Sequence, residues 1–135
     1  MLEHILHRNN LNDAYLKVTK NKGSHGVDGV STSELKAQIS EEWYTICNQL
    51  QKGTYQPSPV RRIEIPKSNG GKRKLGIPTV MDRMIQQAIN LYLQSMYDPI
   101  FSTKSYGFRP GKRAHDAVRQ AKTYIGIYKS NFICK

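Results

Sequence analysis

The fold is decided by residues 60–77, which read VRRIEIPKSNGGKRKLGI. The four residues Ser-Asn-Gly-Gly in the middle are typical of a tight turn. On both sides of this turn, successive side chains alternate between the two faces of a strand. In each expected strand one set of residues shares a face: Arg61, Ile63 and Ile65 before the turn, and Arg73, Leu75 and Ile77 after it. The stretch therefore predicts a β-hairpin over 60–77 with a basic tip.

Helical periodicity surrounds this hairpin, since apolar residues recur three and four positions apart. Helices are expected over about 11–20, 31–53, 79–97 and 112–128. Ser31 and Glu34 form a capping-box pattern at the start of the second. The last residues, NFICK, are typical of the start of a strand. Together these signals predict an α+β fold, with 135 residues forming a single domain.

Two of the expected helices carry an apolar stripe that we expect to be buried. In the helix of 79–97 the stripe is Ile85, Ala88, Ile89, Tyr92, Leu93 and Met96. In the last helix it is Ala114, Ala117, Val118, Ala121 and Ile125. At the other end of the chain, His4 and His7 precede the first helix, in a terminus that we expect to be frayed.

The chain is strongly basic, with 21 Lys and Arg against 10 Asp and Glu and a net charge of +11. The segments 61–74 and 104–122 together hold ten of these eleven surplus charges. Such focused charge indicates a polyanion, with nucleic acid as the first choice. No run approaches the roughly 18 apolar residues of a membrane span. The N-terminus lacks the apolar core of a signal peptide, which predicts an intracellular protein.

The hairpin tip is the first candidate site. Its ammonium and guanidinium groups and its turn N–H groups suit phosphate, although lysines on an exposed hairpin also block edge-to-edge pairing. The four cations around the turn are Lys67, Lys72, Arg73 and Lys74. The glycines do not match the spacing of an ordinary P-loop.

The second candidate site interleaves aromatic residues and cations: Tyr106, Phe108, Arg109, Lys112 and Arg113. This pattern is typical of proteins that bind single-stranded nucleic acid by stacking and charge neutralisation. In the alternative interpretation, Tyr106 and Phe108 anchor a loop to the core and Arg109 serves as a cap. In either case we expect at least one of the two aromatic side chains to be buried.

The sequence predicts no metal or catalytic centre of its own. Cys47 and Cys134 lack the spacing of metal ligands, and the four His residues have no nearby partners that complete a ligand set. Two-metal phosphoryl transfer requires clustered carboxylates, and the chain shows no such cluster. We therefore expect this chain to bind phosphates without catalysing a reaction.

Four runs, in order along about 20–135, strongly resemble the N-terminal part of group II intron reverse transcriptases, also called maturases. They are NKGSHGVDGVS (21–31), GTYQPSPVRRIEIPK (53–67), GGKRKLGIPTVMDRMIQQAI (70–89) and YDPIFSTKSYGFRPGKRAHDAV (97–118). The resemblance implies the helical fingers subdomain with its β-hairpin and the start of the palm. An N-terminal extension and lid would occupy about 1–32, the fingers about 33–100, and the passage to the palm about 101–135.

The resemblance also implies roles for single residues. Lys67 and Arg73 match fingers residues that contact the triphosphate of the incoming nucleotide. Contacts to template or intron RNA are expected from Arg61, Arg62, Lys72, Lys74, Arg83, Arg109, Lys112 and Arg113. Gly23, Gly26 and Gly29 would shape the lid. Lys74 departs from the family, which usually has proline there, so the return strand is expected to be less rigid.

The partners implied by the resemblance are group II intron RNA, an RNA template, a DNA primer, a dNTP and the remainder of the reverse transcriptase. The palm active site with its Mg²⁺, the thumb and the maturase regions would follow Lys135. We therefore expect that the chain alone binds no Mg²⁺ and does not polymerise DNA. The implied setting is the bacterial cytoplasm. Two alternatives remain at this point: a stand-alone intron-RNA-binding module, and self-association through the unfinished C-terminal strand.

Overall fold

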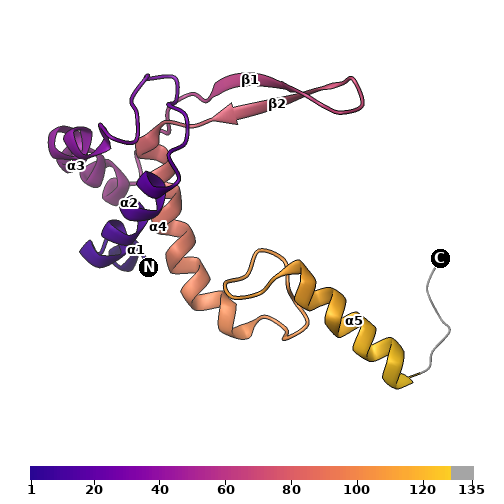
Figure 1. Cartoon of the computed structure of the whole chain (residues 1–135). Coiled ribbons are helices and arrows are strands. Elements are labelled where there is room, and N and C mark those ends of the chain that lie inside the picture. Colours follow the sequence, from indigo (N-terminus) through magenta and orange to yellow (C-terminus); the bar gives the residue numbers. More distant parts are fainter. Residues whose placement is uncertain (129–135) are drawn as a thin grey trace. The chain divides into compact units, whose positions relative to one another are not determined.

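The computed structural model describes residues 1–128 and combines helices with a two-stranded antiparallel sheet, as an α+β chain should (Figure 1). Its elements are α1 (Leu2–Ile5), α2 (Arg8–Lys20), α3 (Leu35–Lys52), β1 (Arg61–Pro66), β2 (Lys72–Ile77), α4 (Val80–Tyr97), the 3₁₀ helix η1 (Asp98–Ile100) and α5 (Ala114–Tyr128). The chain forms two compact units, Met1–Gln94 and Ser95–Lys135. The strand expected at 131–135 lies outside the described residues.

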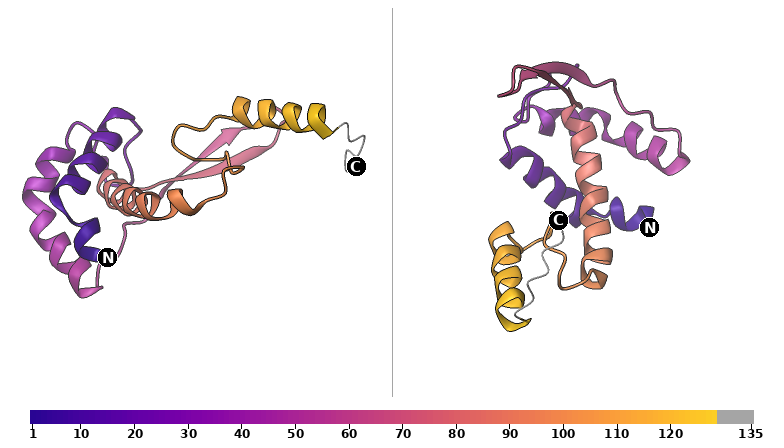
Figure 2. Two further views of the ribbon diagram at one scale, coloured as in Figure 1. Left: turned by 90° about the horizontal axis from the view of Figure 1, so that it is seen from below. Right: turned by 90° about the vertical axis from the view of Figure 1, so that its right-hand side faces the viewer.

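The core of the first unit joins α2 and α3 to the first half of α4, and the three helices lie side by side (Figure 2). Leu35 of α3 and Val80 of α4 are its largest fully buried side chains. The other buried apolar residues are Ile5, Ala14, Val18, Ile46, Met81, Met84, Ile85 and Ala88. The helices predicted in this region are confirmed, with small changes at their ends.

The N-terminus is ordered as a helical turn, so the expectation of a frayed end was wrong. The His4 ring stacks on Tyr92 with 5.8 Å between ring centroids. His7 caps α2, because its Nδ1 accepts a hydrogen bond from the Asn9 amide at 3.3 Å. The Asn10 side chain donates to the carbonyl of Ala88 in α4 at 3.0 Å. These contacts place α1 and the start of α2 against α4.

Helix α3 follows the expected capping signal in part. The Glu34 carboxylate accepts the Ser31 N–H at 2.8 Å and the Ser31 hydroxyl at 2.6 Å. These hydrogen bonds hold the pKa of Glu34 below its ordinary value. The serine hydroxyl therefore donates to the carboxylate, and only one half of the capping box forms. At the other end, Gly53 adopts φ 69°, the left-handed conformation that ends many helices.

The hairpin forms as predicted and continues one pair beyond the two strands. Arg61 pairs with Ile77 and Pro66 with Lys72. The Lys67 N–H then donates to the Gly71 carbonyl at 2.7 Å, and the Gly70 N–H donates to the Lys67 carbonyl at 3.1 Å. Gly70 has φ 81°, which a three-residue hairpin loop requires at its last position. The turn chemistry of the sequence thus fixes the register.

The second half of the α4 stripe is not buried, contrary to expectation. Ile85 and Ala88 are buried, but Ile89, Leu93 and Met96 are 38%, 37% and 49% exposed. The described helices cover only the first half of α4, because the buried residues of this helix end at Ala88. Periodicity predicted the helix correctly, whereas burial also requires an opposing surface.

In the second unit, α5 also forms as predicted without burying its expected apolar stripe. The helix is confirmed, and Asp116 accepts a hydrogen bond from the Arg113 amide at its start, at 3.0 Å. Its expected core face is largely exposed, with Val118 and Ile125 each 55% exposed and Ala114 and Ala121 also exposed. Ala117 alone of the predicted stripe is partly buried. No described helix or strand of this unit supplies an apolar surface opposite α5.

Candidate nucleotide and nucleic-acid interface

Asp82 fixes the base of the hairpin. This residue is buried, with only 2% of its surface exposed. Its carboxylate accepts hydrogen bonds from the Tyr55 hydroxyl at 2.7 Å, the Ser58 N–H at 3.1 Å and the Thr79 hydroxyl at 2.7 Å. Tyr55 and Ser58 precede β1, and Thr79 follows β2. One buried side chain therefore holds both ends of the hairpin.

Asp82 was missed by the sequence reasoning, although a signal was present. Thr79 caps α4 by accepting the Asp82 N–H at 3.2 Å, so the pattern Thr-x-x-Asp is a capping signal. Burial, together with the bond to Asp82, raises the pKa of the Tyr55 hydroxyl well above its ordinary value. Tyr55 thus stays protonated and continues to donate.

The glycine loop of 21–30 lies against this base. A Cβ on Gly26 would lie 2.6 Å from Thr79 Cα, so only glycine allows the two backbones to approach this closely. On Gly23 a Cβ would lie 2.5 Å from Nη1 of Arg83. Gly29 has φ 75°, a conformation that favours glycine. The three predicted lid residues therefore shape the loop, each through its own geometry, whereas their role as a lid stays a prediction.

Two of the predicted RNA contacts, Arg61 and Arg83, also meet this loop. The Arg83 guanidinium donates to the Ser24 carbonyl at 2.7 Å, and the Arg61 guanidinium lies 3.5 Å from Nε2 of His25. The Nε atoms of both arginines are buried and make no hydrogen bond within the described residues. Both cations therefore hold the glycine loop beside the hairpin base, and RNA contact by either stays a prediction.

The hairpin separates its cations between two faces. Ile65 pairs with Arg73, and Lys67 pairs with Gly71, so alternation places Lys67 and Arg73 on the same face. The Lys67 stem lies over Gly71, with its Cδ 3.8 Å from where a Cβ would be. The opposite face carries Arg62, Glu64, Lys72 and Lys74. The two residues predicted to bind a triphosphate are thus neighbours beside the turn.

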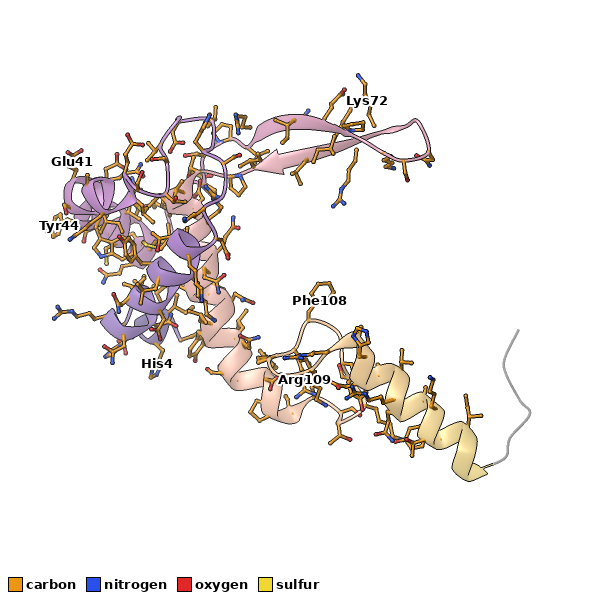
Figure 3. All side chains as sticks on the ribbon, viewed as in Figure 1. His4, Glu41, Tyr44, Lys72, Phe108 and Arg109 are labelled. Atoms are coloured by element: carbon orange, nitrogen blue, oxygen red, sulfur yellow. The ribbon has the colours of Figure 1, made fainter. Side chains whose placement is uncertain are left out.

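On the opposite face Lys72 makes an ion pair. Its Nζ lies 2.9 Å from Glu64 Oε2, with 73% and 48% of the two side chains exposed. Figure 3 labels Lys72 on the hairpin. Such an exposed ion pair contributes little to stability. Lys72 can therefore leave Glu64 for another anion at little cost. Arg62 and Lys74 are exposed as well. RNA contact by these three residues stays a prediction.

In the second unit Arg109 is a structural clamp. Its Nε and Nη2 donate to the Asp98 carboxylate and carbonyl, both at 2.7 Å, and Nη1 donates to the Ser102 carbonyl at 2.9 Å and to the Ser105 carbonyl at 3.4 Å. Only 11% of the Arg109 side chain is exposed. The bond from Arg109 holds the pKa of the Asp98 carboxyl below its ordinary value. Arg109 therefore caps backbone carbonyls of this loop, and RNA contact by Arg109 stays a prediction.

Lys112 has a similar structural role. Its Nζ donates to the Thr103 carbonyl at 2.6 Å and lies 4.8 Å from the centroid of the Tyr106 ring. Arg113 differs, since its side chain is exposed and makes no hydrogen bond or ion pair with residues 1–128. Of the three cations predicted here, Arg113 is the most available to a ligand.

The two aromatic residues of this loop do not behave as expected. Tyr106 is partly buried and Phe108 is fully exposed, so the expectation that at least one would be buried was wrong. Sequence reasoning had no signal for this difference, because residue types and spacing alone do not specify which of the two rings packs against the loop. Phe108 also has φ 55°, an unusual conformation for a bulky residue.

Within residues 1–128, no three His, Cys, Asp or Glu side chains lie close enough together to hold a metal ion. The expectation that the chain alone binds no Mg²⁺ stays a prediction. None of the described helices is both long and apolar enough to span a membrane.

Comparison with known proteins identifies relatives, although no protein-family model matches the chain. Protein YkfC of Escherichia coli K12 is 44% identical over 106 residues, which are 77% of this chain and 28% of YkfC. The group II intron-encoded protein LtrA of Lactococcus lactis subsp. cremoris is 40% identical over 114 residues, 84% of this chain and 19% of LtrA. A putative COX1/OXI3 intron 2 protein of Saccharomyces cerevisiae is 32% identical over 111 residues, 81% of this chain and 12% of that protein.

These similarities cover most of the chain, and they confirm the resemblance that the four motif runs indicated. The chain is related to the group II intron-encoded proteins and intron maturases. It spans less than a third of the length of the relatives described above.

Proposed function

We propose that this chain forms the N-terminal fingers part of a group II intron reverse transcriptase, where it binds template or intron RNA and the incoming dNTP. In this proposal Mg²⁺ and the catalytic carboxylates belong to other parts of the complete enzyme, which works in the cytoplasm. The chain itself positions substrates and carries out no chemistry.

The observation that carries the proposal is the shared hairpin face of Lys67 and Arg73. Lys67 is paired with Gly71, and Arg73 lies two residues further along β2. Diagonal neighbours of this kind have Cα atoms about 7–8 Å apart, so the long side chains of Lys67 and Arg73 can reach the same polyphosphate. Two cations beside a polyphosphate neutralise the charge that develops during phosphoryl transfer.

The hairpin base supports this role. Asp82 fixes the segments that enter and leave the hairpin, and Gly26 packs directly on Thr79. A two-stranded hairpin is marginally stable alone, so these contacts determine where its tip points. Accurate placement of the cations matters because positioning is a large part of catalysis by phosphoryl-transfer enzymes.

The test compares the two faces of the hairpin. Binding of a dNTP is measured by titration for the parent chain and for the variants Lys67→Ala, Arg73→Ala and Lys72→Ala. We expect the first two to weaken binding about 5- to 10-fold each, since each removes a charge-assisted contact. Lys72→Ala removes the same charge from the opposite face, so it should change binding less than about twofold. Equal losses in all three variants would show an unspecific charge effect and contradict the assignment.

RNA binding without any effect of Lys67→Ala or Arg73→Ala on dNTP binding would favour the alternative, a stand-alone intron-RNA-binding module.

A further inference from the structure

Phe108 is presented to solvent in a strained conformation. The residue is fully exposed, and its backbone φ is 55°. A bulky side chain in the left-handed region is an outlier that persists only where the surrounding structure imposes it. Such strain is concentrated at functional sites, so the cause of this conformation indicates a use.

The loop around Phe108 imposes the conformation. The next residue, Arg109, is fixed through Asp98 and the carbonyls of Ser102 and Ser105. The Lys112 ammonium closes the loop from the other side by donating to the Thr103 carbonyl. In Figure 3 the Phe108 ring stands away from the loop. The hydrogen bonds of Arg109 and Lys112 thus support the loop that carries the exposed Phe108 ring.

The surroundings of Phe108 indicate what the ring contacts. In 104–122 six basic residues stand against a single acidic one, Asp116. Arg109 lies over the Phe101 ring at 5.5 Å and Lys112 over the Tyr106 ring at 4.8 Å, whereas no cation of the described chain covers Phe108. The Phe108 ring therefore offers an uncovered aromatic face in a positively charged part of the chain. Single-stranded nucleic acid complements both properties, because it carries negative phosphates and has bases free to stack.

We propose that Phe108 stacks on an unpaired base of a single-stranded RNA whose neighbouring phosphate contacts Arg113. The inference rests on the proposed RNA binding and specifies the substrate as an unpaired strand. Arg109 and Lys112 position the loop, and the exposed Arg113 side chain makes the phosphate contact.

Binding of a fluorescein-labelled U12 RNA and of a labelled 12-base-pair RNA duplex, followed by fluorescence anisotropy, tests this proposal on the whole chain. Phe108→Gly should weaken binding of the single strand about 5- to 100-fold, the usual effect of losing one base stack. Its effect on the duplex should be less than twofold, because duplex bases are already stacked. Thermal unfolding should be unchanged or shifted upward, since glycine relieves the positive φ. A structural role would instead lower the unfolding temperature.

Substitutions of different chemistry separate base stacking from general apolar contact. Phe108→Trp should retain or increase affinity, and its fluorescence should be quenched by RNA beyond any change at Trp43, the single native tryptophan. Phe108→Leu should lose affinity, as glycine does. Full affinity in the leucine variant would mean that an apolar contact suffices, which would overturn the proposal.

Tyr44 provides the matched control. It is also an exposed aromatic residue, at 81%, but it follows Glu41 and Glu42 in a part of the chain with no net positive charge. Tyr44→Ala should leave RNA affinity unchanged. Arg113→Ala should reduce the slope of log K against log salt by about 0.7, whereas Phe108→Gly should lower affinity at constant slope.

The outcomes distinguish this inference from the function on which it rests. If the parent chain binds neither RNA, the proposed RNA binding fails and the stacking role fails with it. If the parent binds U12 and Phe108→Gly binds equally well, only the stacking role is overturned.

Discussion

The Tyr55 hydroxyl donates a 2.7 Å hydrogen bond to the Asp82 carboxylate, and this bond joins the segment entering the hairpin to the helix that follows it. The two residues are 27 positions apart in the sequence, and the whole hairpin lies between them. Since Asp82 also accepts from Ser58 and Thr79, the carboxylate closes the hairpin at its base. The direction of the tip therefore depends on a buried group far from Lys67 and Arg73.

Tyr55→Phe should lower the free energy of unfolding by about 1.5–3 kcal/mol. The variant keeps the ring but removes one donor to a buried carboxylate, and hydrogen bonds to charged groups typically have this value. Urea unfolding followed by circular dichroism measures the change.

The control is Tyr44→Phe, which removes the hydroxyl of a tyrosine that is 81% exposed. Its effect should stay within about 0.5 kcal/mol. If both variants lost the same stability, the bond to Asp82 would have no special role at the hairpin base.

The hairpin shows what local sequence determines. Its register was predictable because alternation assigns residues to faces and because Asn69-Gly70 defines the turn, in which Gly70 has φ 81°. The helices were predictable for the same reason, since apolar periodicity and capping residues act within one or two turns. These signals need no knowledge of distant contacts.

Arg109 and Phe108 show what local sequence leaves open. A loop that alternates aromatic residues and cations is equally compatible with a clamp and with a ligand site. The difference lies in the positions of Asp98 and of the backbone carbonyls, which accept from Arg109 only once the loop has closed. The exposure of Val118 has a related origin, because burial depends on an opposing surface that periodicity does not specify.

Gly26→Ala should destabilise the first unit by about 1–3 kcal/mol, the usual range for overpacking. The new Cβ would lie 2.6 Å from Thr79 Cα and 2.8 Å from its backbone nitrogen, so the loop or the start of α4 must shift. Gly71→Ala is the control in the same unit, because there the nearest atoms would lie at 3.5 and 3.8 Å, in ordinary contact. Chemical denaturation of both variants tests this, and an equal effect would refute a close backbone approach.

Asp98 should titrate below the ordinary range of aspartate in the parent chain, and its pKa should rise in Arg109→Gln. The hydrogen bond from Arg109 favours the charged carboxylate and thereby lowers the pKa of Asp98. Carbon-detected NMR of the carboxyl group measures both values. An unchanged Asp98 titration in the variant would show that the clamp does not form in solution.

This lowered pKa determines the pH at which the clamp stabilises the loop. A carboxyl group whose pKa is lower in the folded state stabilises above its unfolded pKa, about 3.9 for aspartate. That stabilisation is lost as the pH falls through the lower, folded value. Protection of the 101–111 amides should therefore decrease in acid in the parent chain. Asp98→Asn should remove much of this acid dependence.

RNA binding by the whole chain should weaken steeply with salt. The basic segments 61–74 and 104–122 expose several cations, among them Arg62, Lys74 and Arg113. Each contact between a cation and a phosphate of a single strand contributes about −0.7 to the slope of log K against log salt. Six contacts give a slope of about −4, measurable by anisotropy between 50 and 300 mM KCl. Lys36→Ala is a suitable control, because this lysine lies on α3 outside both basic segments and should leave the slope unchanged. A slope near zero in the parent chain would mean that the two basic segments do not contact phosphate.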